Sequence, residues 1–420
     1  MKFFYLTALL FLYCPFSLWA NDATLILDDE QLAMDCKISL MMKAKHSISL
    51  SYYAINEDEV GLKYAAIACY KAKQGIDVKI IIEKSKSKFT RNLALLFKEY
   101  GIELKYYNSF QLHNIFKNFS WLHDKLLVVD SSYVVVGGRN LNNKYYPNSV
   151  SPTELVDIET LLKGKTGADA QKYVHHLYHS KFASDVKDKQ IDTVRYLYLK
   201  SVIKRNIDSI RELPYRNWDS LMSPVKEAHF YRDNYKKWPK SQRVSRMVLR
   251  LINNSKKELM IVSPYLIPPL KCMRALKAAK KRGVDITLIS NSPQISDAKI
   301  IAAAYMNDRR KYLKRNFHIY EYNGKKMLHD KIFMADDNTT IVGSYNFDNI
   351  SYRMNAEIIA EIKDNDFAIK MNKHIQKRKL DCMQILKVKD KNPYNEASTA
   401  KKTKGNQMLL RIFPFIRRFL

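Results

Sequence analysis

The chain has 420 residues, with 71 Lys and Arg against 42 Asp and Glu, which gives a formal net charge of +29 at pH 7. Because 46% of the residues are hydrophobic and 12% are aromatic, the chain can bury a sizeable core, which excludes wholesale disorder and collagen-like or fibrous repeats. The length fits one large domain or two ordinary ones, and the charge predicts an anionic partner, either nucleic acid or an acidic lipid face.

The first 20 residues have the composition of an export signal. One early lysine, Lys2, precedes an apolar run, and the small Ala20 stands before the polar Asn21. This pattern predicts an exported protein, periplasmic or secreted. Leu18 and Pro15 fit a cleaved signal poorly, so an uncleaved N-terminal anchor is the alternative. Downstream, no run reaches the ~18 apolar residues of a spanning helix, which predicts a soluble or peripheral body.

A unit of strand, helix and strand occurs twice. Residues 47–55 form an apolar and aromatic run, followed by a helical stretch that ends at Gly75 and by the strand-like DVKIIIE. Residues 259–267 open the same series again, with a helix that ends at Gly283 before DITLIS. A repeat of this length indicates two similar domains rather than a solenoid. Alternation of short apolar strands with helices predicts an α/β sandwich in each half.

The composition divides the chain into five parts. We expect a signal or anchor over 1–20, a first α/β domain over 21–184, a helical connector over 185–241, a second α/β domain over 242–387 and a basic tail over 388–420. In the tail, apolar residues recur at helical spacing with arginines off the stripe: Leu409, Ile412, Phe413, Ile416, Phe419 and Leu420, with Arg411, Arg417 and Arg418. This segment is predicted either to lie on an anionic membrane or to dock on the protein's own core.

Both halves carry the pattern H-x-K-x4-D-x6-G-[GS]-x-N. The copies consist of His123, Lys125, Asp130, Gly137, Gly138 and Asn140, and of His329, Lys331, Asp336, Gly343, Ser344 and Asn346. Six fixed positions would occur by chance in such a chain on the order of once in 10⁵. Two copies in register with a domain repeat therefore indicate a functional constellation.

The residue types in this pattern suit a phosphodiester. A His and a Lys two residues apart on a strand point to the same face, and the Asn beyond the next turn can approach the same place. Two halves around a pseudo-twofold axis would gather two imidazoles, two ammonium groups and two amides in one pocket. The Lys and Asn side chains can neutralise phosphate oxygens without a metal, while one imidazole attacks phosphorus and the other protonates the departing alcohol. The five cysteines show no zinc-ligand or disulfide spacing, so no metal and no cofactor is expected.

The aspartates of the pattern are expected to be structural. Asp124 and Asp330, in the middle of each H-D-K, should point to the strand face opposite the His and Lys. Asp130 and Asp336 are predicted to anchor turns through hydrogen bonds rather than to exchange protons.

These residues resemble the phospholipase D superfamily, the double-HKD enzymes, and most closely its bacterial cardiolipin synthases. The segment GGRNLNNKYY, with Arg139, Tyr145 and Tyr146, and the segment SPYLIP resemble that branch. Asn143 and Val156 depart from it, because an acidic residue and an arginine are common at those positions. The resemblance implies two phospholipase D-like α/β sandwich domains that form a pseudo-twofold bilobal enzyme, with one chain sufficient for the active site.

The resemblance also implies roles for single residues. His123 would be the nucleophile and His329 the acid, an assignment that the pseudo-symmetry leaves open. Glu357 and Asp157 would bond the two imidazoles, and Gly138 and Ser344 would support phosphate binding.

The function expected from residues and resemblance together is an exported, membrane-associated enzyme. It would be a phosphatidyltransferase or phospholipase D that acts on phospholipids through a phosphohistidine, with an anionic phospholipid membrane as partner. A metal-independent nuclease acting on DNA or RNA is the alternative, because +29 also suits a polyanion. A catalytically inactive membrane-binding scaffold is a third class, and complete retention of both motifs argues against it.

Overall fold

The computed structural model describes residues 23–107, 120–146, 154–186, 191–210, 216–235, 242–387, 405–410 and 412. The expected signal or anchor over 1–20 and most of the expected tail lie outside these residues. Among the helices in the described ranges, none is both long and apolar enough to cross a membrane.

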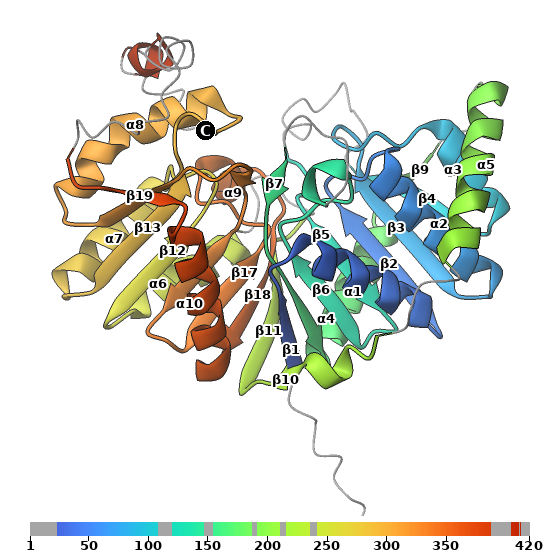
Figure 1. The fold of residues 1–420 in the computed structure, drawn as a ribbon, viewed down its shortest axis with the longest axis horizontal. Helices are drawn as coiled ribbons and strands as arrows, with labels where there is room; N and C mark the ends of the chain where they lie inside the picture. Colours follow the sequence, from blue (N-terminus) through green and yellow to red (C-terminus); the bar gives the residue numbers. More distant parts are fainter. Residues whose placement is uncertain are drawn as a thin grey trace, which may run out of the picture.

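The first half is built on a nine-stranded mixed sheet (Figure 1). In spatial order its strands are β10 (Ser223–Pro224), β1 (Ala23–Leu27), β8 (Glu159–Lys163), β6 (Tyr133–Gly137), β5 (Lys125–Val129), β2 (Ser47–Tyr52), β3 (Asp77–Glu83), β4 (Glu103–Tyr107) and β9 (Ala183–Asp185). The strands β2, β3 and β4 are parallel, and the helix between each pair makes the crossover that parallel neighbours need.

The second half repeats this arrangement in a sheet of eight strands. In spatial order these are β11 (Glu227–Arg232), β18 (Ile358–Lys363), β17 (Thr339–Gly343), β16 (Ile332–Ala335), β12 (Glu258–Val262), β13 (Asp285–Asn291), β14 (His318–Tyr322) and β19 (Cys382–Ile385). Here β12, β13 and β14 are the parallel strands, as β2, β3 and β4 are in the first half. Two similar α/β domains are therefore present, as the repeat predicted.

Helices and sheets form alternating layers. Within the described ranges, the helices of eight or more residues are α1 (Glu30–Lys43), α2 (Glu59–Lys73), α3 (Arg91–Glu99), α4 (Lys165–Tyr178), α5 (Thr193–Ile210), α6 (Arg243–Asn254), α7 (Leu270–Lys281), α8 (Lys299–Leu313) and α10 (Asn365–Lys379). One apolar cluster joins the first sheet to α1, α2, α3 and α5, and another joins the second sheet to α6 and α7. A third cluster lies between the sheets and includes α4 and α10.

The strand β5 shows how the sequence creates these layers. All five of its residues are buried, because both faces of the strand are covered. Leu127 and Val129 belong to the outer cluster, whereas Leu126 and Val128 belong to the cluster between the sheets. The two halves are thus held together by a continuous apolar core, and Figure 1 shows their sheets side by side.

Glycines end the repeated helices where the sequence predicted. Gly75 and Gly283 lie two residues beyond the ends of α2 and α7, with φ of 83° and 90°. Such φ values are strained for any residue with a Cβ, so glycine is favoured at a helix end that turns into a strand.

The segment 185–241 contains more than the expected helical connector. Helix α5 packs against α2 and α3. Beyond it, β10 adds an edge strand to the first sheet, and β11 pairs along its whole length with β18 of the second sheet. The sequence EAHFYR of β11 has one buried residue only, as edge strands often do, and this hid the strand from the hydrophobic pattern.

Candidate active site

The two motif histidines lie where the halves exchange backbone hydrogen bonds. The short strands β7 (Leu155–Val156) and β15 (Met327–Leu328) pair in parallel, and the His329 N–H donates to the Val156 carbonyl at 2.7 Å. On the other side of the pseudo-twofold axis, the His123 N–H donates to the Ala356 carbonyl at 2.9 Å. Each histidine is thus fixed to the opposite half by its own backbone.

Each imidazole bonds a carboxylate from the opposite half. Nδ1 of His123 lies 2.9 Å from Oε2 of Glu357, and Nδ1 of His329 lies 2.5 Å from Oδ2 of Asp157. Both carboxylates are buried, while His123 and His329 keep 7% and 8% of their surface exposed. A carboxylate at Nδ1 favours the tautomer with its proton there, which leaves the Nε2 lone pair available for chemistry.

Small residues of the motifs lie behind these carboxylates. The Ser344 hydroxyl donates a short hydrogen bond to Oε2 of Glu357, and the Ser351 hydroxyl donates to Oε1 at 2.7 Å. At the position equivalent to Ser344, a Cβ on Gly138 would lie 2.3 Å from both carboxylate oxygens of Asp157. We expected Gly138 and Ser344 to support phosphate binding, whereas their described contacts position Asp157 and Glu357.

The motif lysines are buried beside the histidines. Nζ of Lys125 donates to the His123 carbonyl at 2.9 Å and lies 4.7 Å from the centre of the Tyr53 ring. Nζ of Lys331 contacts the His329 carbonyl, lies 2.7 Å from its Nδ1 and is 3.6 Å from Asp157. The ammonium group of each lysine therefore lies beside its own histidine.

Burial and mutual repulsion disfavour the positively charged forms of the motif histidines and lysines. Burial lowers the pKa of His123 to about 4, against the opposing effect of Glu357 and with help from Lys125 and Lys331. Burial likewise lowers the pKa of Lys125 to about 7, and the charge of Lys331 adds to this shift. Burial and the neighbouring Lys331 lower the pKa of His329 as well. A bound anion would stabilise the positively charged forms of these side chains, which burial disfavours. The site is therefore suited to an anionic ligand.

The two motif asparagines differ in their contacts. Asn140 accepts the Ala54 N–H at 3.2 Å and donates to the Tyr145 hydroxyl at 3.1 Å. Oδ1 of Asn346 is buried and accepts no hydrogen bond from the residues that the structure describes. A buried amide oxygen without a hydrogen-bond donor is suited to a ligand that supplies one.

Two tyrosines contact the imidazoles edge-on. The Tyr53 ring centre lies 4.7 Å from that of His123, and the Tyr145 ring centre lies 5.5 Å from that of His329. The sequence drew attention to Tyr145 through the tyrosine pair after the first motif. Tyr53 and the hydroxyl donor Ser351 were missed, because neither belongs to a motif and only the folded chain brings them to the site.

Asp130 and Asp336 lie away from the histidines, at the far ends of β5 and β16. Six residues lie between each aspartate and its histidine, which corresponds to about 20 Å of extended chain. Both have positive φ, of 52° and 55°, in the turn that follows the strand. The Asp130 carboxylate accepts the N–H groups of residues 45–47.

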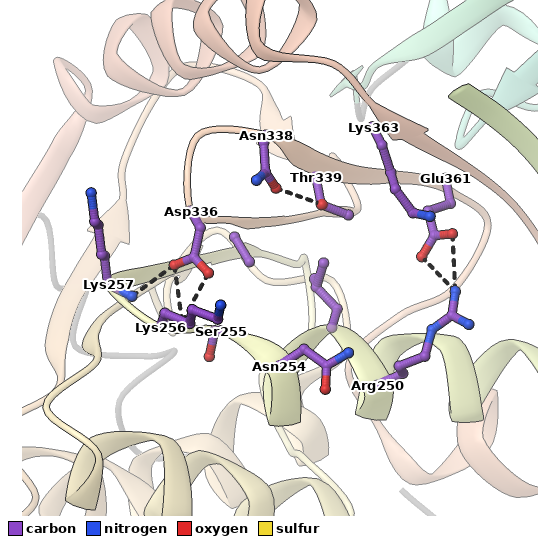
Figure 2. Close-up of a pocket in the computed structure, with 12 residues that line it drawn as sticks. Arg250, Asn254, Ser255, Lys256, Lys257, Asp336, Asn338, Thr339, Glu361 and Lys363 are labelled. Carbon is purple, nitrogen blue, oxygen red and sulfur yellow. Dashed lines mark hydrogen bonds and ion pairs between the residues drawn. The ribbon is translucent and has the colours of Figure 1, made fainter. Parts of the chain in front are cut away.

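Figure 2 shows the matching contacts of Asp336 with the backbone of Lys256 and Lys257, at 2.8 Å in the shortest cases. This carboxylate lines a cavity of about 560 Å³, in which Arg250 pairs with Glu361. The cavity therefore lies at the opposite end of the sheet from the histidine pair.

Asp124 and Asp330 are fully buried and have different partners. Asp124 accepts hydrogen bonds from the Ser51 and Tyr173 hydroxyls, at 2.7 and 2.8 Å, and burial raises its pKa to about 7. Asp330 accepts from Nε of Arg378 at 3.0 Å and lies 3.2 Å from Nε2 of His374. Although burial opposes them, these cations hold the pKa of Asp330 below its usual value.

No group of three or more His, Cys, Asp and Glu side chains that could hold a metal ion occurs within the described part of the chain. The charge of Lys331 acts on the His123 imidazole and the charge of Lys125 acts on the His329 imidazole, so the two copies of the motif face one another.

The comparisons with known proteins agree with this geometry. The family described as cardiolipin synthase, PLD-like domain, matches residues 38–173 and 248–379, one match to each half. An uncharacterised protein of Helicobacter pylori is 23% identical over 83% of this chain and 77% of its own length. A cardiolipin synthase of Geobacillus thermodenitrificans is 24% identical, over 85% of this chain and 66% of that protein.

Among solved structures, the phosphatidylserine synthase of Haemophilus influenzae superimposes with a TM-score of 0.70 at 14% identity, over 94% of this chain and 95% of that one. At this identity the likeness establishes the shared fold. The family match covers more than half of the chain and includes both copies of the histidine motif. The chain belongs to the cardiolipin synthase, phospholipase D-like domain family.

Proposed function

We propose that the protein is a phosphatidyltransferase or phospholipase D that acts on phospholipids through a phosphohistidine. The observation that carries the proposal is the convergence of two imidazoles, each bonded through Nδ1 to a buried carboxylate, on a site with two buried lysines. The cardiolipin synthase among the relatives supports phospholipid as the substrate class.

In the first step, Nε2 of His123 attacks phosphorus, and the bond from phosphorus to the first alcohol breaks. His329 gives a proton to the departing alcohol. In the second step His329 takes a proton from the acceptor, which is a lipid hydroxyl or water, and the acceptor oxygen displaces His123 from phosphorus. The positive charge that each imidazole carries in turn is stabilised by Glu357 or Asp157.

The lysines act in the bound complex. An anionic phosphodiester favours the charged forms of Lys125 and Lys331, whose pKa values burial lowers in the free protein. The same anion favours the imidazolium form of His329, which the acid role requires.

The expected setting of this reaction is an anionic lipid surface outside the cytoplasm. The composition of residues 1–20 supports export, and the charge of +29 supports attraction to anionic lipid. Both histidines come from one chain, so a monomer suffices for the pocket.

One assay tests this proposal. Purified protein is incubated in chelator with phosphatidylglycerol, with and without a small alcohol, and separately with plasmid DNA. Phosphatidic acid or a phosphatidyl alcohol as product supports the proposal, and the ratio of the two separates hydrolysis from transfer. Cleaved DNA with unchanged lipid would overturn it in favour of a nuclease.

A further inference from the structure

A second cavity lies in the half that carries His329. It has a volume of about 420 Å³ and is lined by residues of α7, α8 and α9 (Asn349–Arg353), together with Pro268 and Arg315. Figure 1 shows α8 and α9 toward the same edge of the molecule as β7, which pairs with the strand before His329. The lining contains no residue of the histidine motif. The cavity is therefore a separate place at the same end of the sheets as the histidine pair.

The chain connects this cavity closely to the catalytic pocket. Asn349, which lines the cavity, follows the motif residue Asn346 by three positions. Between them, Phe347 donates its N–H to the Ser263 hydroxyl at 3.0 Å and accepts the Ile267 N–H at 3.0 Å. Ile267 directly precedes the lining residue Pro268. The segment that carries the motif asparagine thus continues into the lining of the cavity.

Positive charge dominates the lining. Its ionisable side chains are one carboxylate and five cations: Asp308, with Arg274, Lys277, Lys311, Arg315 and Arg353. Asp308 is buried and pairs with Lys311 at 2.9 Å, and the Arg315 guanidinium donates to the Lys311 carbonyl. The single carboxylate therefore neutralises one cation and leaves a large positive excess.

Three of these cations have no counter-ion on the protein. Arg274, Lys277 and Arg353 are exposed and form no hydrogen bond or ion pair with any residue that the structure describes. Arg274 and Lys277 are three positions apart in α7, so they lie on the same face of the helix, where like charges repel. A bound anion would offset this repulsion, and arginine and lysine are the side chains that most often bind phosphate.

Apolar side chains stand beside these charges. Leu270, in the first turn of α7, is 72% exposed, and Met273 lines the cavity three positions later. The helical segment of the tail is close by, because Leu410 packs in one cluster with Ile267. Nucleic acid would engage the cations alone. A phospholipid offers phosphate to the cations and acyl chains to the exposed leucine, so the combination favours lipid.

We propose that this cavity binds the phosphate of an anionic phospholipid headgroup, with Leu270 inserted among the acyl chains of the same surface. The bound lipid is an anchor and not the substrate, because the cavity contains no motif histidine. It holds the end of the molecule that carries the histidine pair against the membrane. The inference takes its class of ligand from the proposed function, but the binding requires no turnover.

Occupancy of the cavity is measured at Met273. In His123→Ala protein with 13C-methyl methionine, the Met273 signal is assigned through Met273→Leu and followed during titration with dihexanoylphosphatidylglycerol below its critical micelle concentration. We expect the signal to shift, and Arg274→Gln combined with Lys277→Gln should weaken the binding about tenfold or more. Dihexanoylphosphatidylcholine, which has no net charge, and inorganic phosphate, which has no acyl chain, should each bind at least about tenfold more weakly than the anionic lipid.

Vesicle binding tests the role as an anchor. Arg274→Gln with Lys277→Gln should bind phosphatidylcholine vesicles that contain phosphatidylglycerol about ten- to thirtyfold more weakly than the wild type. The matched control is Lys256→Gln with Lys257→Gln, which removes the same charge from exposed lysines of the cavity in Figure 2, at the opposite end of the sheet. This pair should change vesicle binding by less than about twofold. Both pairs should keep the wild-type rate on soluble bis(p-nitrophenyl) phosphate.

Three outcomes would overturn the inference. The first is a Met273 signal that phosphatidylglycerol does not shift, and the second is a vesicle affinity that both pairs lower equally. The third is a Met273 signal that responds as strongly to inorganic phosphate, or only to a single-stranded oligonucleotide, which would assign the cavity to a free anion or to nucleic acid. Absence of lipid turnover by the wild type would overturn the proposed function instead, while these binding measurements would still decide the role of the cavity.

Discussion

His123 and Glu357 are 234 positions apart in the chain, yet Nδ1 of the imidazole lies 2.9 Å from the carboxylate. Asp157 of the first half likewise contacts Nδ1 of His329 in the second half, 172 positions away. Each imidazole is therefore held at Nδ1 by a carboxylate of the opposite half. The pocket exists only when the two sheets are packed together, which makes the interface between them part of the active site.

Replacing these carboxylates by amides should remove most activity without unfolding the protein. In Glu357→Gln or Asp157→Asn the amide can turn its NH2 group to Nδ1, which selects the tautomer with its proton on Nε2. An imidazole in that form cannot attack phosphorus or accept a proton there. We expect kcat to fall on the order of 10³- to 10⁴-fold, the scale of the equivalent change in serine proteases.

The matched control for these variants is Glu361→Gln. Glu361 is buried in β18, the strand that begins directly after Glu357, but it pairs with Arg250, in the cavity of Figure 2. Its replacement should leave kcat within about twofold, since it does not touch an imidazole. Equal losses in Glu361→Gln and Glu357→Gln would show that the effect comes from stability rather than from the tautomer.

The two histidines should be indispensable and non-additive. Because nucleophile and acid act in series on one phosphorus, His123→Ala and His329→Ala should each lower kcat by about 10³-fold or more. The double variant should be scarcely slower than either single one. Single-turnover assays on bis(p-nitrophenyl) phosphate provide the measurement. A variant that keeps a tenth of the wild-type rate would contradict a single shared site.

The repeated motif predicted the two sheets and the convergence of imidazoles and lysines, because a strand fixes which side chains share a face. Asp157 and Glu357 were expected at the imidazoles only from resemblance. That each comes from the opposite half depends on how the sheets pack, and no local pattern encodes it. β11 escaped prediction because an edge strand lacks a continuous apolar run.

The middle aspartates of the two motifs should respond oppositely to replacement by asparagine. The pKa of Asp124 is raised to about 7 by burial, so the folded state favours its neutral form, and the stability that it contributes declines as the pH rises from about 4 to about 7. Asp124→Asn should therefore be tolerated, and relative to the wild type it should gain on the order of 2 kcal/mol between about pH 5 and about pH 8.

For Asp330 the sign is reversed. Its pKa is lowered, so its carboxylate stabilises the fold above the ordinary carboxyl range, and that stability is lost as the pH falls through the folded pKa. Asp330→Asn leaves Arg378 and His374 without this charged partner and should cost about 3–5 kcal/mol at neutral pH. Urea unfolding of both variants at two pH values is the measurement. Similar changes in the two variants would contradict the assignment of different ionisation states.

The described part of the tail supplies a test of the two alternatives drawn from its sequence. Residues 405–410 are helical, and Leu410 is buried in a cluster with Ile267, Ile301, Ala303 and Ala304. On the same short segment, Met408 is 65% exposed and Ile412 is 57% exposed. One side chain thus docks on the protein's own core, while others are available to an anionic lipid surface.

Separate substitutions should separate these two contributions. Leu410→Ala removes buried apolar surface, so it should lower the free energy of unfolding by about 1–3 kcal/mol and leave vesicle binding unchanged.

Met408→Ser combined with Ile412→Ser removes exposed apolar surface only. This pair should weaken binding to phosphatidylglycerol vesicles without changing the melting temperature, and hydrolysis of a soluble phosphodiester should persist because the histidine pocket is built elsewhere. Removal of the chain after Lys404 should combine both effects, and its loss of vesicle binding should be largest at low salt, because salt screens the attraction of the tail's basic residues to anionic lipid. Vesicle co-sedimentation at low and high salt, together with thermal melts, provides the measurements. Undiminished vesicle binding by the serine pair and by the truncated chain would show that the tail serves only the protein's own core.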